Sequence, residues 1–88
     1  MIVTTTPNVE GKQISQYLGI VTQCSIFAVP GGAKMIQRGW RGSFDAAIEE
    51  LTQQAEQLGA DAIVGVIYNA YKSGMVDYLH VTGTAVKF

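Results

Sequence analysis

Residues 58–66 constrain the fold of this chain more than any other segment. They read Leu-Gly-Ala-Asp-Ala-Ile-Val-Gly-Val, so helix-forming sequence gives way through Gly59 to a continuous apolar run. Glycine adopts the left-handed conformation that ends many helices at little cost, which makes Gly59 a plausible helix terminator. The segment therefore predicts a helix end, a glycine turn and a buried strand in direct succession.

The predicted helix covers residues 43–58. Its apolar residues recur at steps of three and four and so form one stripe: Phe44, Ala47, Ile48, Leu51, Ala55 and Leu58. Glutamates and glutamines fill the remaining faces, Gln54 among them, and we expect those faces to lie in water. Ser43 precedes the stripe and is predicted to be the N-cap. A one-sided stripe indicates a helix that packs on a sheet.

Strands are predicted on both sides of this helix, at residues 1–5, 13–28, 61–69 and 76–87. The three longer strands are apolar or small on both faces, whereas a sheet covered by one helix should have one polar face. Residues 70–75, which include Gly74, are predicted to be a loop that joins the last two strands as in a hairpin. The main elements follow in the order β-α-β-β, which predicts a single α+β domain over residues 1–88.

The composition favours association between copies of the chain. Charged residues make up 15% of the sequence, against about 25% in an average soluble domain, while hydrophobic residues make up 48%. A small domain has proportionally more surface than a large one, so it should need more charge rather than less. We therefore expect a homo-oligomer in which other copies cover the second face of the sheet.

The same counts restrict the partners and the compartment. The net charge of −1 argues against a general nucleic-acid binder. The only cysteine cannot form a disulfide within the chain, and the N-terminal residues lack the pattern of a secretory signal. No apolar run approaches the roughly 18 residues of a membrane span. We expect a cytoplasmic protein that has copies of itself as partners, and neither nucleic acid nor membrane.

Candidate metal ligands are few. Cys24 and His80 lie on two predicted strands and are the only cysteine and histidine, whereas a soft-metal site usually takes three or four such ligands. A complete site would need ligands from several subunits; the alternatives are a buried structural thiol and a surface or interface histidine. No elbow-like turn surrounds Cys24 and nothing in the spacing pairs it with a base, so we expect no enzymatic activity.

A second candidate site consists of Arg38, Trp40 and Arg41, just before the predicted start of the helix. A helix N-terminus with adjacent arginines can bind a phosphate or carboxylate group. The alternative is a solvated or interface loop. The residues themselves identify no cofactor.

Two further segments, together with residues 58–66, resemble a known family. Near the start the chain reads Thr-Thr-Pro-Asn-Val-Glu-Gly-Lys at 5–12 and Tyr-Leu-Gly-Ile-Val-Thr at 17–22, and near the end Val-Thr-Gly-Thr-Ala-Val-Lys at 81–87. In this order they are similar to the small bacterial and archaeal YbjQ family, also named UPF0145. The resemblance implies a dodecin-like two-layer subunit, with an antiparallel sheet whose last strand lies between the other two.

The resemblance also implies an assembly and a binding role. Members form ring-shaped homo-oligomers, typically pentamers, and carry a heavy-metal-binding label without a proven activity. The segment at 29–42 is shorter here than in typical members. The resulting hypothesis is a homo-oligomeric binding module that holds a heavy metal at subunit boundaries. The alternatives are the binding of a small anion or, as in dodecins, an aromatic ligand, or a purely structural ring for protein interactions.

Overall fold

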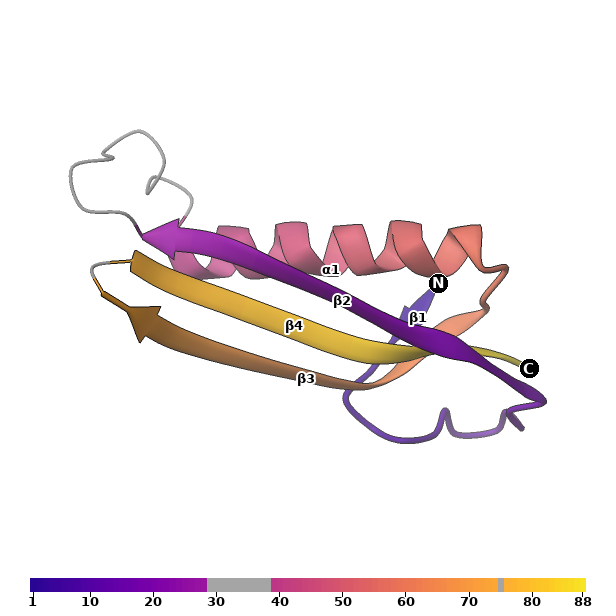
Figure 1. Ribbon diagram of the computed structural model, residues 1–88. Helices are drawn as coiled ribbons and strands as arrows, with labels where there is room; N and C mark the ends of the chain where they lie inside the picture. The colour runs from indigo at the N-terminus through magenta and orange to yellow at the C-terminus, as the bar shows by residue number, and fades with distance from the viewer. Residues whose placement is uncertain (29–38, 75) are drawn as a thin grey trace.

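The computed structural model describes residues 1–28, 39–74 and 76–88. In these residues one helix lies along one face of a four-stranded sheet (Figure 1). The elements in chain order are β1 (Ile2–Val3), β2 (Gln16–Ala28), α1 (Gly39–Gln57), β3 (Ala62–Ser73) and β4 (Val76–Lys87). The predicted α+β class is therefore confirmed. In this part of the chain, no helix combines the length and hydrophobicity needed to cross a membrane.

The strand order in the sheet is β1-β3-β4-β2. β4 is antiparallel to both β2 and β3, which confirms that the last strand lies between the other two long ones. The sheet is not wholly antiparallel, because the two residues of β1 pair parallel to β3 at its outer edge. The Thr4 amide continues this pairing by donating to the Ile63 carbonyl at 3.0 Å, and the Thr4 carbonyl accepts from the Val66 amide at 3.1 Å.

The main core lies between α1 and the sheet. Its buried residues are Val21, Ala47, Leu51, Ala55, Ile63, Val66, Leu79, Val81 and Ala85. Phe44 and Ile48 pack against this cluster, so the predicted stripe is confirmed over most of its length. Leu58 is the exception. It follows Gln57, the last helical residue, and is 47% exposed, because it lies beyond the turns that contact the sheet.

The start of the helix differs from the prediction. α1 begins at Gly39, and Ser43 lies inside it with 1% of its surface exposed, so the N-cap prediction for Ser43 is wrong. Ser43 stands one turn before Ala47 and two turns before Leu51, and so continues the buried stripe toward the N-terminus. Serine fits this buried position because it is small. The sequence suggested an N-cap because the serine hydroxyl is also a common capping group.

The end of the helix agrees with the prediction. Gly59 has a φ of +79°, which is the left-handed conformation expected after the last turn. The Gly59 amide donates to the Glu56 carbonyl and the Ala60 amide donates to the Ala55 carbonyl, each at 3.0 Å. These two bonds form a Schellman motif, which satisfies carbonyl groups that the end of the helix would otherwise leave free.

The hairpin between β3 and β4 is tighter than the predicted loop at 70–75. β3 continues to Ser73, which pairs with Val76, and Gly74 lies in the turn with a φ of +63°. Residues 69–73 are small or polar enough to indicate a loop, but cross-strand pairs such as Tyr71 with Tyr78 keep them in the sheet. This extension brings Tyr71 into register with β4.

Gln54 is not solvated as the sequence suggested. Its Oε1 accepts from the Thr22 amide at 3.2 Å, and its Nε2 donates to the Thr22 carbonyl at 2.9 Å. Thr22 lies on β2, an edge strand, so its outward backbone groups have no strand partner. Gln54 therefore links α1 to this edge, and one side chain bonds both backbone groups.

Substitution of a core residue should measure the contribution of the helix stripe. Leu51→Ala should lower the free energy of unfolding by about 2–5 kcal/mol, because it leaves a cavity under α1. Chemical denaturation followed by circular dichroism measures this loss. Gln53→Ala, on the exposed face of the same helix, is the matched control and should change stability by less than about 0.5 kcal/mol. Equal losses at the two positions would show that α1 does not pack through Leu51.

Candidate functional site

The face of the sheet opposite α1, called the open face below, carries the candidate site. Along β4, buried Leu79 and Val81 face α1, and they alternate with partly exposed Tyr78, His80 and Thr82, which point to the open face. The open face is covered at one end, where Val9, Ile14 and Phe88 pack against Ala62, Val64 and Val86. No other described segment lies on it.

The open face is amphipathic rather than uniformly apolar. Two large aliphatic side chains lie on it, Ile20 with 77% and Ile67 with 60% of its surface exposed. Between them the register places Thr22 and Thr82, two polar residues. The prediction that both faces are apolar is therefore correct only in part.

Cys24 on β2 and His80 on β4 are direct partners in the register of the sheet. Both backbone polar groups of Thr22 are bonded to Gln54, so they point away from β4. Cys24 is two residues farther along the strand and has the same orientation. Cys24 and His80 therefore form a pair without mutual backbone hydrogen bonds, the kind whose Cα atoms are about 4.5 Å apart and whose side chains lie closest.

A hydrogen bond between Thr22 and His80 engages one of the two ring nitrogens of the histidine. The Thr22 hydroxyl donates its single proton to the Val81 carbonyl at 3.2 Å, and its oxygen lies 2.9 Å from His80 Nε2. Nε2 is therefore engaged by Thr22 Oγ1, and in the tautomer that protonates Nε2 the lone pair of Nδ1 is available to a ligand. Histidines that bind metals are commonly held in this way through the other ring nitrogen.

The thiol of Cys24 is exposed, so the alternative of a buried structural thiol is wrong. Its Sγ lies 3.8 Å from the hydroxyl of Tyr71, which reaches across β4 from β3. The Tyr71 ring stacks on Tyr78, with centroids 5.3 Å apart and an angle of 17° between the planes. The hydrogen bond with Cys24 raises the pKa of the Tyr71 phenol above its ordinary value, with smaller contributions from desolvation and nearby charge.

The Cys24–His80 pair, with its neighbours Thr22 and Tyr71, fits a soft metal ion only in part. A thiolate and an imidazole are suitable donors for such an ion. However, the described residues contain no group of three or more His, Cys, Asp or Glu side chains that could hold a metal. One chain therefore offers a two-donor site here, not a closed four-ligand site.

The candidate anion site receives no support from the structure. Arg38 lies outside the described residues, and Trp40 and Arg41 belong to the first turn of α1 rather than preceding it. Only the backbone is described at Trp40 and Arg41, so the expected cluster of arginines at a helix N-terminus stays a prediction.

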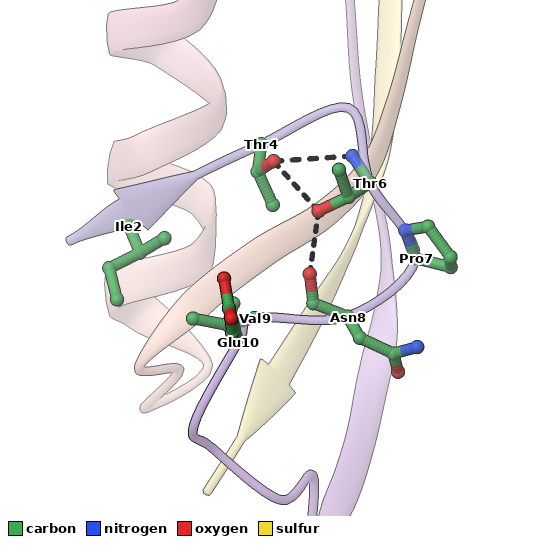
Figure 2. Close-up of a pocket in the computed structure, with 7 residues that line it drawn as sticks. All are labelled: Ile2, Thr4, Thr6, Pro7, Asn8, Val9 and Glu10. Atoms are coloured by element: carbon green, nitrogen blue, oxygen red, sulfur yellow. Dashed lines mark hydrogen bonds between the residues drawn. The ribbon is translucent and has the colours of Figure 1, made fainter.

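A separate hollow of about 470 Å³ lies along the N-terminal segment (Figure 2). The hydroxyls of Thr4 and Thr6, which line it, lie 2.9 Å apart, and Thr6 also donates to the Asn8 carbonyl. These polar groups are bonded to one another rather than directed at a ligand. The hollow adjoins β1, at the opposite edge of the sheet from Cys24 on β2.

Two residues of the site were missed by sequence reasoning. Thr22 was given no role, and Tyr71 was placed in a loop. Tyr71 could have been found from the hairpin, since a turn at Gly74 pairs Tyr71 with Tyr78; the missing signal was the exact length of the turn. Thr22 could not have been found in this way, because it lies on β2, whose register with β4 the hairpin does not set.

The contact between Cys24 and Tyr71 can be tested by titration. In Cys24→Ala the pKa of the Tyr71 phenol should fall toward its ordinary value, because the substitution removes the main cause of the increase. NMR of assigned tyrosine ring carbons between pH 8 and pH 12 measures it. Ser25→Ala, the next residue of β2, is the matched control and should leave this pKa unchanged. A Tyr71 pKa that does not respond to loss of Cys24 would contradict the hydrogen bond.

Comparison with known proteins gives consistent results. Residues 29–88 match the model of the YbjQ family, which is described as "Putative heavy-metal-binding". A UPF0145 protein of Pseudomonas putida strain GB-1 is 34% identical over 105 residues, which cover 99% of this chain and 98% of the relative. A UPF0145 protein of Nostoc punctiforme is 35% identical over 106 residues, with the same two coverages. These aligned lengths exceed the 88 residues of this chain, so the relatives contain residues that it lacks.

A solved structure supports the fold. The crystal structure of a Pediococcus pentosaceus protein, described as having unknown function and belonging to the DUF74 family, matches with a TM-score of 0.69. The match covers 100% of this chain and 97% of the other at 24% sequence identity. On the strength of the family match and the curated relatives, the chain belongs to the YbjQ family, also named UPF0145.

Proposed function

We propose that this protein is a homo-oligomeric, non-catalytic module that binds a soft metal ion through Cys24 and His80. The observation that carries the proposal is the pairing of these two residues at one position of the β2–β4 ladder. A pair without mutual backbone hydrogen bonds directs both side chains to the open face at short range. The description of the family as heavy-metal-binding agrees with this assignment.

The local bonding supports a role for both side chains. Thr22 Oγ1 engages Nε2 of His80, so in the tautomer that protonates Nε2 the lone pair of Nδ1 is available to a metal. Cys24 is exposed, so its thiol is accessible and can lose its proton when a metal binds. The reducing conditions of the cytoplasm keep such a thiol free, and we place the protein there for this reason.

Association with other copies follows from the rest of the open face. Ile20 and Ile67 lie along the sheet from the metal pair, and they are the large aliphatic residues most exposed on this face. Burial of such side chains is worth roughly 1.5–3 kcal/mol each, which favours covering them with another subunit. Donors from that subunit would complete the coordination of any ion that needs more than two protein ligands.

Metal binding is tested by calorimetric titration with zinc at pH 7.5. Cys24→Ser and His80→Ala should each weaken binding by at least tenfold, because each removes one of two donors. Asn69→Ala is the matched control, since Asn69 pairs with His80 from the other side but offers no soft donor, and it should retain the parental affinity.

Two results would oppose metal binding at this position. If the parent protein binds zinc no tighter than the millimolar level, the Cys24–His80 pair is not a zinc site. Equal affinities of the parent and both ligand variants would place the metal elsewhere in the chain.

The oligomer is tested by light scattering coupled to size exclusion. The parent should have a mass several times the 9.5 kDa of one chain. Ile20→Lys should shift the mass toward that of a monomer, because it places a charge on the open face without disturbing the core. Gln57→Lys, at the exposed end of α1, is the control and should preserve the parental mass. A folded parental monomer at micromolar concentration would refute self-association.

A further inference from the structure

The number of soft donors in the candidate site restricts the ions that it can hold. Cys24 and His80 contribute one sulfur and one nitrogen per chain, and the described residues place no third His, Cys, Asp or Glu beside them. Zinc in structural sites takes four protein ligands in a tetrahedral arrangement. Cu(I) and Ag(I) are also soft, and they differ from zinc in accepting two donors in a nearly linear arrangement.

The charge of the surroundings restricts the ion further. A bound cysteine is a thiolate, while His80 binds as a neutral imidazole, so the pair contributes a single negative charge. The adjacent side chains of Thr22 and Asn69 are neutral. Asp77, the carboxylate of β4, lies 4.0 Å from Lys72 at the hairpin end of the strand. A monovalent ion therefore gives a neutral complex, whereas a divalent ion leaves one positive charge uncompensated.

That residual charge matters because of the apolar residues on the same face. Ile67 pairs with Thr82, two residues from His80 on the same face, and covering this part of the face with another subunit would remove water from the site. An uncompensated charge is costly to transfer out of water, while a neutral complex is not penalised in this way. Covering the face thus discriminates against the divalent ion.

We infer that the Cys24–His80 pair selects a monovalent soft ion, Cu(I) or Ag(I), over zinc and binds one ion per chain. The inference rests on the proposed function, since it names the class of metal for the same two residues. The sulfur of Cys24 and Nδ1 of His80 are the two donors. The Tyr71 hydroxyl, 3.8 Å from that sulfur, is positioned to hydrogen-bond the thiolate and hold its orientation.

The experiment compares Ag(I) and Zn(II) on the full-length protein in the same chloride-free, thiol-free buffer at pH 7.5. Competition titrations should give one Ag(I) per chain and an affinity at least a hundredfold higher than that for zinc. Cys24→Ser should lower the Ag(I) affinity at least a hundredfold and His80→Ala about tenfold, while Asn69→Ala should have no effect. Circular dichroism of each variant checks that the fold is intact.

A spectroscopic measurement separates this site from adventitious binding to thioethers. In protein labelled with ¹⁵N, ¹⁰⁹Ag should split the Nδ1 resonance of His80 by direct coupling and leave Nε2 unsplit, because Nε2 is engaged by Thr22 Oγ1 at 2.9 Å. Unchanged Ag(I) affinity in His80→Ala, or coupling to Nε2, would overturn the inferred donors.

The outcomes also separate this inference from the proposed function. Zinc binding that equals or exceeds Ag(I) binding, depends on both residues and saturates at one ion per two chains would overturn the monovalent assignment. That result would leave soft-metal binding intact, with the site completed by a second copy. Absence of binding by either ion above the millimolar level would refute both.

Discussion

The pairing of β4 with β2 on one side and β3 on the other is the constraint on which the rest of the structure depends. Successive side chains of β4, which is central, point to opposite faces of the sheet. Leu79 and Val81 enter the core under α1, while His80 points to the open face. A slip by one residue would exchange these two sets of side chains. The hydrophobic core and the candidate metal pair are therefore held in place by the same hydrogen-bond ladder.

The features of the fold that local signals specify could be predicted from the sequence. The stripe through Leu51 and the end of the helix at Gly59 follow from spacing and from one residue type, and both are found in the structure. The start of the helix could not be predicted, because Ser43 is a small buried residue whose hydroxyl resembles a cap. Gln54 was misplaced for a related reason: its composition indicates solvent, while its position beside an unpaired strand edge makes it a structural link.

The candidate site depended more on register than on residue type. Cys24 and His80 could be named because they are the only residues of their kinds, but their proximity required the pairing of β2 with β4. The contributions of Thr22 and Tyr71 required more, namely the position of a hydroxyl beside His80 and the length of a turn. Such information comes from contacts between residues far apart in the chain, so periodicity within a segment cannot supply it.

The tight turn at Gly74 has a consequence for how this fold can vary. It fixes the register of β3 and β4 from one end, while the connection between β2 and α1 is a separate segment of the chain. A change in the length of that connection need not shift any pair in the ladder, because the pairing of Cys24 with His80 is set within the strands themselves. The fold can thus gain or lose residues before its helix without a change in the cross-strand pairing of Cys24 with His80.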